Sequence, residues 1–150
     1  MAIARLLIAN RGEIAIRIAA AAAELGVSTV SVYAEDDARS LHRFRTDDSA
    51  PLEGSGPAAY LDAARLVAVA RRHGCDAVHP GYGFLAESAA FARACEEAGL
   101  NFVGPAPRVL ELLADKARAR ELARRHGGPV LAGSAGPVTM DDALAVLHGL

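Results

Sequence analysis

The chain has 150 residues, of which 52% are hydrophobic and 23% charged, and its formal net charge is -2. This composition is typical of a globular domain and gives no basic surplus, so we expect no nucleic-acid partner. No apolar run has the length of a membrane span, the N-terminus lacks a signal-peptide pattern, and Cys75 and Cys95 are too few for a disulfide framework. We therefore expect a cytoplasmic protein with no membrane partner.

Strand and helix patterns alternate along the chain up to Pro105. Apolar runs predict strands over residues 4–9, 27–33, 50–52, 76–79 and 101–103. Apolar residues at helical spacing predict helices over residues 13–25, 59–73 and 88–98. Strands that alternate with helices form parallel sheets, because each helix carries the chain back to the end where the next strand begins. We therefore predict an α/β fold with a Rossmann-like parallel sheet flanked by helices.

The pattern changes after Pro105. Residues 108–126 predict one long helix with apolar residues on one face, residues 130–132 are short and extended, and residues 141–147 predict an amphipathic helix. No strand follows this last helix, which indicates the start of a second, incomplete domain.

Two loops follow predicted strands, at the edge of the sheet where ligands gather in this kind of fold. The first is Asn10-Arg11-Gly12-Glu13, where Gly12 permits a tight turn and the start of the next helix offers N–H groups to an anion. Arg11 and Glu13 are equally able to make purely structural contacts, and the residues alone favour that interpretation.

The second loop runs from His79 to Leu85 and places two glycines around Tyr82. Such a loop brings its backbone close to a ligand and offers an aromatic ring to it. Glu87 follows at the start of a predicted helix, where a carboxylate is favoured by the helix dipole. A tight turn with Tyr82 and Phe84 packed in the core remains an equal alternative.

Lys116 is the single lysine among 16 basic residues. A site that requires a compact ammonium group, such as one that contacts phosphate, would explain it. Chance and a solvated basic face remain the alternative, which spacing alone favours. The sequence has no Walker A, H-E-x-x-H, G-x-S-x-G or paired-cysteine motif, so P-loop and common hydrolase functions are disfavoured and no metal ligands are expected.

Four segments, taken together, resemble the biotin carboxylase family in order and spacing. They are residues 8–15, residues 79–85 with the pair Glu87-Ser88, residues 102–105 and the pair Asp115-Lys116. The resemblance covers nearly all of the chain. It implies a biotin carboxylase N-terminal (pre-ATP-grasp) domain over residues 1–106 and the truncated beginning of an ATP-grasp domain over residues 107–150.

The resemblance also implies roles for single residues. Lys116 matches the family lysine that contacts ATP phosphates. Tyr82 and Gly83 match the loop of the biotin and bicarbonate pocket, and Glu87 matches a carboxylate that holds an active-site arginine beyond this chain. Arg17 and Glu24 match positions at the dimer interface of bacterial biotin carboxylases.

The function implied by the resemblance is that of an ATP-dependent ligase, in which ATP activates bicarbonate for the carboxylation of biotin. The complete enzyme would use ATP, Mg²⁺ and biotin, work with a biotin carboxyl carrier domain and a carboxyltransferase, and form a homo-oligomer. The family's catalytic residues and metal ligands lie after residue 150. We therefore expect no catalytic residue or metal ligand within this chain, no stable cofactor binding by it, and no activity of it alone.

Two alternatives remain at this point. Another ATP-grasp ligase would share the two-part layout but not the loop at residues 79–85. A non-catalytic α/β interaction module would dock a partner through the helix at residues 13–25. The final carboxyl acceptor, whether acetyl-CoA, propionyl-CoA, a longer acyl-CoA or pyruvate, also stays open.

Overall fold

The computed structural model describes residues 2–131, 139–140 and 144. The chain divides into two compact units, Met1–Pro107 and Arg108–Leu150, and each is described by itself. Within the described residues, no helix has both the length and the apolar character that a membrane crossing requires.

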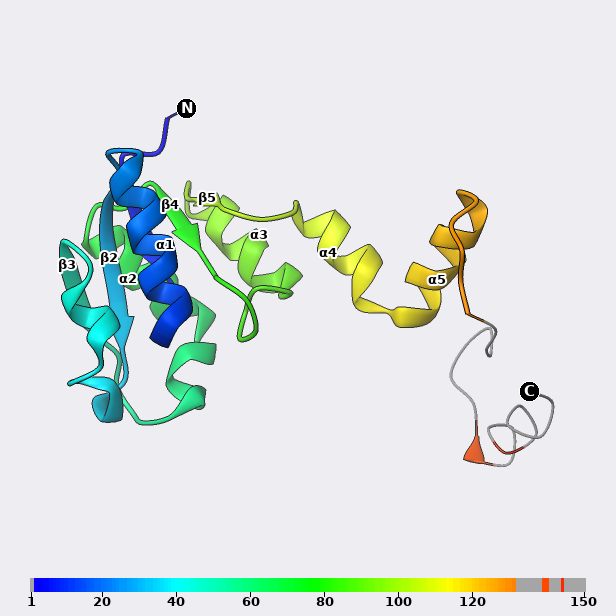
Figure 1. Cartoon of the computed structure of the whole chain (residues 1–150), viewed down its shortest axis with the longest axis horizontal. Coiled ribbons are helices and arrows are strands. Elements are labelled where there is room, and N and C mark those ends of the chain that lie inside the picture. The colour runs from blue at the N-terminus through cyan, green and yellow to red at the C-terminus, as the bar shows by residue number, and fades with distance from the viewer. Residues whose placement is uncertain (1, 132–138, 141–143, 145–150) are drawn as a thin grey trace. The chain divides into compact units, whose positions relative to one another are not determined.

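The first unit is built on a five-stranded sheet in the order β3-β2-β1-β4-β5 (Figure 1). The strands are β1 (Arg5–Ile8), β2 (Ser28–Tyr33), β3 (Asp48–Pro51), β4 (Ala77–His79) and β5 (Asn101–Phe102). Every neighbouring pair is parallel, which confirms the predicted fold class. The strand predicted at residues 50–52 begins earlier, because polar Asp48 and Ser49 at the sheet edge also pair with β2.

The centre of the sheet holds the apolar core. Leu7 of β1 pairs with Val30 of β2 on one side and with Val78 of β4 on the other, and all three side chains are fully buried. A strand covered on both faces needs apolar residues at successive positions, which explains why β1 has a continuous apolar run and no alternation.

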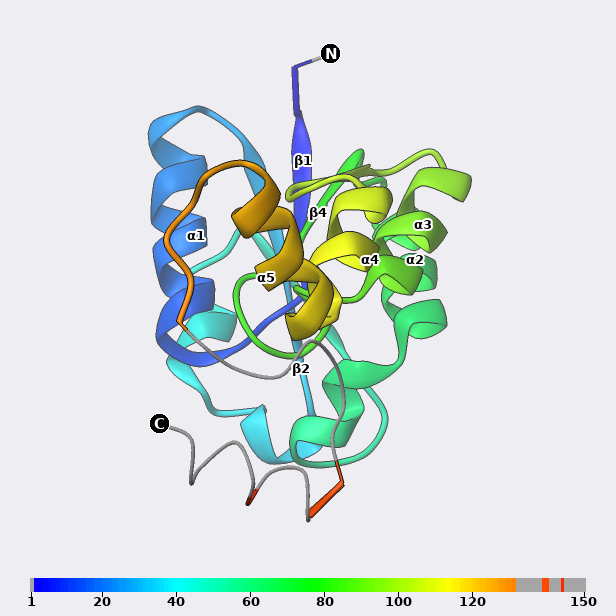
Figure 2. The same cartoon turned by 90° about the vertical axis from the view of Figure 1, so that its right-hand side faces the viewer.

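Helices cover both faces of this sheet. Figure 2 shows α1 (Gly12–Glu24) on one face and α2 (Ala63–Arg72) with α3 (Ala89–Glu97) on the other. The short 3-10 helix η2 (Leu41–Phe44) contacts α1. The small side chains of α1 pack on Leu6, Ile8 and Ala77 of the sheet, so the start of α1 is held rigidly beside the end of β1.

Capping residues set the helix boundaries that differ from the prediction. The helix predicted over residues 59–73 is two elements, η3 (Pro57–Leu61) and α2, because Asp62 caps α2 by accepting a 2.9 Å hydrogen bond from the Arg65 N–H. Ser88 caps α3 in the same way, through the Phe91 N–H at 3.2 Å. A short 3-10 helix, η1 (Glu35–Asp37), was not predicted.

The single helix predicted over residues 108–126 is wrong. Residues 107–125 instead form α4 (Pro107–Ala114) and α5 (Lys116–Arg125). Asp115 between them is extended, and its Oδ1 accepts hydrogen bonds from the N–H groups of Ala117 and Arg118 at 2.8 and 3.1 Å. The helix predicted over residues 141–147 falls largely outside the described residues.

The burial of Leu7 predicts a large loss of stability on truncation. We expect Leu7→Ala to lower the free energy of unfolding by about 2–5 kcal/mol, because the change leaves a cavity in the middle of the sheet. Leu25→Ala is the matched control, since Leu25 is 79% exposed at the end of α1. Urea unfolding of both variants tests this, and equal losses would contradict it.

Candidate functional site

Two loops meet at the carboxyl ends of the neighbouring strands β1 and β4, and Asn10 joins them. Asn10 is 3% exposed, and its Nδ2 donates hydrogen bonds to the backbone carbonyls of Pro80 and Tyr82 at 2.7 and 2.9 Å. Its Oδ1 accepts from the Arg11 N–H at 2.9 Å. One buried amide therefore fixes the loop at residues 10–13 against the loop at residues 80–87.

Gly81 is required by this close approach. Its φ is +68°, and a Cβ there would lie 2.6 Å from Nδ2 of Asn10. The Gly81 N–H donates to Nδ1 of His79 at 3.0 Å, so the loop is also held by the last residue of β4. Only glycine combines this conformation with the space that Asn10 leaves.

A cavity of about 410 Å³ opens between the two loops. It is lined by residues 10–14 and 82–84. Tyr82 is 62% exposed, and its hydroxyl donates a 2.7 Å hydrogen bond to Oε1 of Glu13, which raises the pKa of Tyr82. Tyr82 thus lies in the cavity and not in the core, whereas Phe84 stacks on the buried Tyr60, so the functional interpretation of the loop stays a prediction.

The predicted pocket residues are brought together only in part. Tyr82 and Gly83 line the cavity, whereas Glu87 is not among its lining residues. Glu87 is exposed in a turn directly before Ser88, which caps α3, so it lies just ahead of the helix start as predicted. Its proposed part in holding an arginine stays a prediction.

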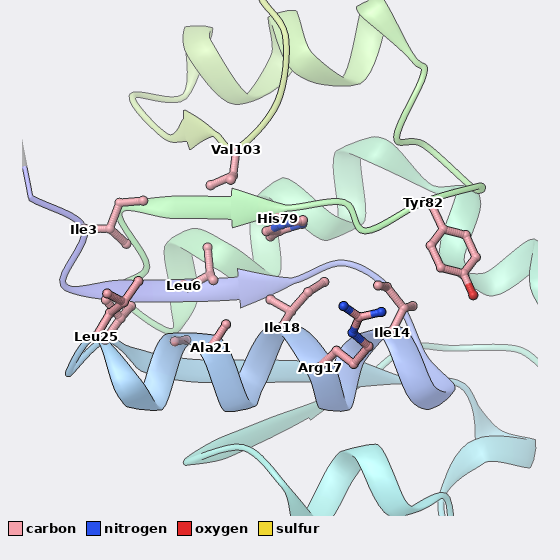
Figure 3. A pocket seen from close by; sticks show the side chains of 12 residues that line it. Ile3, Leu6, Ile14, Arg17, Ile18, Ala21, Leu25, His79, Tyr82 and Val103 are labelled. Carbon is pink, nitrogen blue, oxygen red and sulfur yellow. The ribbon is translucent and has the colours of Figure 1, made fainter.

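An apolar groove of about 450 Å³ runs beside α1 (Figure 3). Apolar side chains of α1 and the sheet form most of it, and Arg17, His79 and Tyr82 also line it. Arg17 and Glu24 are both exposed on α1, but Glu24 does not line the groove. The dimer role of these two residues stays a prediction.

Burial shifts the pKa values of three titratable side chains in the sheet region, His79, Cys75 and Cys95. Burial lowers the pKa of His79, and its Nδ1 accepts from Gly81, so the neutral ring carries its proton on Nε2. Burial raises the pKa of the Cys75 and Cys95 thiols to about 11, so both are protonated at neutral pH. No group of three or more potential metal ligands occurs in the part of the chain that the structure describes.

Lys116 belongs to the second unit. It is exposed and is the first residue of α5, not a mid-helix residue as predicted, because Asp115 caps that helix. The sequence analysis missed the role of Asn10. The one available signal was its place directly after a buried strand, inside a segment that matches the family.

A parallel sheet covered by helices on both faces defines an α/β domain, and its cavity lies at the carboxyl edge, where ligands bind in this class of fold. Residues 2–110 match the model of the family described as "Biotin carboxylase, N-terminal domain". The chain belongs to this family.

Two relatives of this chain are carboxylases by name. The pyruvate carboxylase of Bacillus subtilis is 47% identical over 144 residues, which are 95% of this chain and 12% of the relative. A solved single-chain, multi-domain long-chain acyl-CoA carboxylase has a TM-score of 0.93 at 54% identity, over 97% of this chain and 15% of that one. The chain thus spans a small part of the length of these relatives.

A third relative has been solved with ligands. It is the biotin carboxylase domain dimer of the 2-oxoglutarate carboxylase of Hydrogenobacter thermophilus, in complex with MgADP, ADP and bicarbonate. Its TM-score is 0.90 at 40% identity, over 99% of this chain and 33% of that one.

Gly81→Ala tests the contact between the two loops. We expect it to destabilise the protein by about 1–3 kcal/mol more than Gly74→Ala, because the new methyl group overlaps Asn10. Gly74 is a matched control, since its φ is +66° and its Cβ would meet open space. Chemical unfolding gives both values, and equal losses would show that the overlap is relieved without cost.

The lowered pKa of His79 predicts that the protein loses stability in acid. Its folded pKa lies below the usual 6.5, so the unfolded chain binds the proton first and stability falls as the pH drops below 6.5. The loss is complete below the folded pKa. His79→Asn keeps an acceptor for the Gly81 N–H but does not titrate, so we expect a flatter dependence of unfolding free energy on pH. If His79→Asn kept the full wild-type pH dependence of the unfolding free energy, another titratable group would be its cause.

Proposed function

We propose that this chain is the N-terminal part of a biotin carboxylase, an ATP-dependent ligase that carboxylates biotin with bicarbonate within a biotin-dependent carboxylase. The observation that carries the proposal is the cavity between the loops after β1 and β4, which lies within the residues that match the family. In this proposal residues 1–106 form the N-terminal domain and residues 107–150 begin the ATP-grasp domain.

The cavity is the proposed biotin and bicarbonate pocket, with Tyr82 and Gly83 on its wall. Its residues suit a small polar ligand. The Tyr82 hydroxyl and the Glu13 carboxylate already form a hydrogen-bonded pair there, and α1 starts at the cavity with N–H groups that have no acceptor within the helix. The chain's own part is to bind and orient, since its loops are fixed by Asn10.

ATP and Mg²⁺, when bound in the complete enzyme, would supply the phosphoryl group that activates bicarbonate. Lys116 is the proposed phosphate contact of this chain. A lysine in the first turn of a helix is disfavoured by the helix dipole, so helix stability does not account for its place. Its exposure leaves the ammonium group able to meet a ligand.

The complete protein is proposed to be a cytoplasmic homo-oligomer that works with a biotin carboxyl carrier domain and a carboxyltransferase. Two relatives support the multi-domain and oligomeric parts of this proposal, one described as single-chain and multi-domain and one as a biotin carboxylase domain dimer. Arg17 and Glu24 are the residues proposed for the dimer interface. Another ATP-grasp ligase or a non-catalytic module is less favoured, because the family match is specific to biotin carboxylases.

Residues 1–150 alone are proposed to be inactive and to bind none of these cofactors stably. The chain covers only 33% of a solved biotin carboxylase domain. Detectable ATP-dependent fixation of bicarbonate by this chain alone would overturn that part of the proposal.

Lys116→Ala in the complete enzyme tests the function and the phosphate contact together. We expect ATP-dependent transfer of labelled bicarbonate to free biotin to fall by about 10²–10³-fold, because a charge that stabilises the reacting phosphate is lost. Arg118→Ala is the matched control, since Arg118 is an exposed cation on the same helix.

The outcomes separate the two parts of that proposal. Full activity in Lys116→Ala would remove the phosphate contact and keep the enzyme class. A wild-type enzyme that consumes ATP with another acid, and never labels biotin, would point to a different ATP-grasp ligase.

A further inference from the structure

Phe84 has an unusual backbone conformation beside the proposed pocket. Its φ is +42°, and within the described residues it is the one non-glycine residue with a positive φ. The left-handed region costs a residue with a side chain about 1–2 kcal/mol. Surrounding contacts must therefore hold Phe84, and it directly follows Gly83 and Tyr82 in the wall of the cavity.

The ring of Phe84 is held on an aromatic and cationic stack. It lies on the ring of Tyr60, with centroids 5.2 Å apart and planes inclined by 21°. The guanidinium carbon of Arg11 is 5.6 Å from the Tyr60 centroid and 5.9 Å from the Phe84 centroid. Arg11 is itself a lining residue of the cavity, so the stack joins both of its loops.

Asp37 fixes the two partners of Phe84 in place. Its Oδ2 accepts hydrogen bonds from Nη1 of Arg11 at 3.0 Å and from the Tyr60 hydroxyl at 2.7 Å, and its Oδ1 accepts from Oγ of Ser40 at 2.7 Å. The Tyr60 hydroxyl also accepts from the Ala34 N–H at 3.0 Å. Arg11, Asp37 and Tyr60 thus each have a hydrogen-bond partner in this partly buried arrangement.

The pKa shifts support a fixed ion pair between Asp37 and Arg11. Burial acts to raise the pKa of Asp37, but the hydrogen bonds from Tyr60, Ser40 and Arg11 outweigh it and leave the pKa below its ordinary value. Burial raises the pKa of Tyr60, which stays a neutral donor. The carboxylate and the guanidinium therefore remain charged and paired near neutral pH.

Three residues make up this arrangement, which we name the clamp: Arg11, Asp37 and Tyr60. We propose that the clamp is a positioning device for the reaction, which holds Phe84 and thereby sets where Tyr82 and Gly83 stand in the biotin and bicarbonate pocket. This inference rests on the proposed function. It assigns Asp37 and Tyr60, which do not line the cavity, a role in substrate affinity that acts through Phe84.

The test uses the complete carboxylase and compares Michaelis constants. We expect Tyr60→Phe, which keeps the ring but loses the bond to Asp37, to raise KM for free biotin and for bicarbonate by about tenfold, with KM for ATP within about twofold of wild type. Tyr33→Phe is the matched control, because Tyr33 also lies under an arginine, Arg43 at 4.3 Å, but outside the clamp.

A second pair of variants acts on Phe84 itself. Phe84→Leu keeps an apolar side chain but removes the stack and is expected to raise the same two KM values, whereas Phe84→Tyr keeps the ring and is expected to raise them less than Phe84→Leu does. These changes leave the hydrogen bonds of Asp37 intact, so they test positioning apart from the stability of the clamp. Thermal unfolding of every variant measures the loss of folded enzyme.

The outcomes are distinct. A purely structural clamp would lower kcat in proportion to folded enzyme and leave all three KM values unchanged in both Tyr60→Phe and Phe84→Leu, which would overturn the inference. An equal rise of all three KM values would also overturn it. A wild-type enzyme that does not carboxylate biotin would overturn the proposed function and this inference with it.

Discussion

The geometry of the site depends on one buried amide. Parallel pairing of β1 with β4 brings the two loops to the same edge of the sheet, but it does not fix their distance. The side chain of Asn10 does so, because it satisfies two carbonyls of one loop and one N–H of the other. A buried amide with these partners is costly to replace, since any apolar substitute leaves three backbone groups unpaired.

Around this amide the molecule combines rigid and strained parts. The sheet and α1 are packed with small and branched apolar residues and give the loops a fixed base. Strain lies at Phe84, where a residue with a side chain takes the left-handed backbone that glycine adopts freely at the neighbouring Gly83. Strain of this kind persists only where the surroundings over-determine it, and the clamp supplies those surroundings.

The strands of the sheet could be predicted from the sequence, but the contacts that form the site could not. Apolar runs such as Leu6-Leu7-Ile8 predict a buried strand, because the pattern lies within a few consecutive residues. The break at Asp115 escaped prediction because an aspartate at helical spacing resembles any polar surface residue until its hydrogen bonds are seen. Asn10, Asp37 and Tyr60 make hydrogen bonds to residues far away in the sequence. Local periodicity cannot predict such contacts.

The family resemblance identified some of the site residues that local patterns do not predict. It directed attention to Tyr82 and Gly83, which the structure does place on one cavity. It carried no information on what supports them, because Asp37 and Tyr60 lie outside the matching segments and the motifs do not show which contacts Asn10 and Arg11 make. Glu87 shows the opposite case, a motif residue that lies off this cavity in the residues described.

The overlap that a side chain at position 81 would have with Asn10 has an evolutionary consequence. Positions 10 and 81 are far apart in the sequence but share one volume, so a larger residue at one is tolerated only with a smaller residue at the other. Asn10 cannot shrink without releasing the loops, and Gly81 cannot grow without displacing it. A single substitution at either position is therefore destabilising. Mutational libraries must vary positions 10 and 81 together to find another pair of residues that fits.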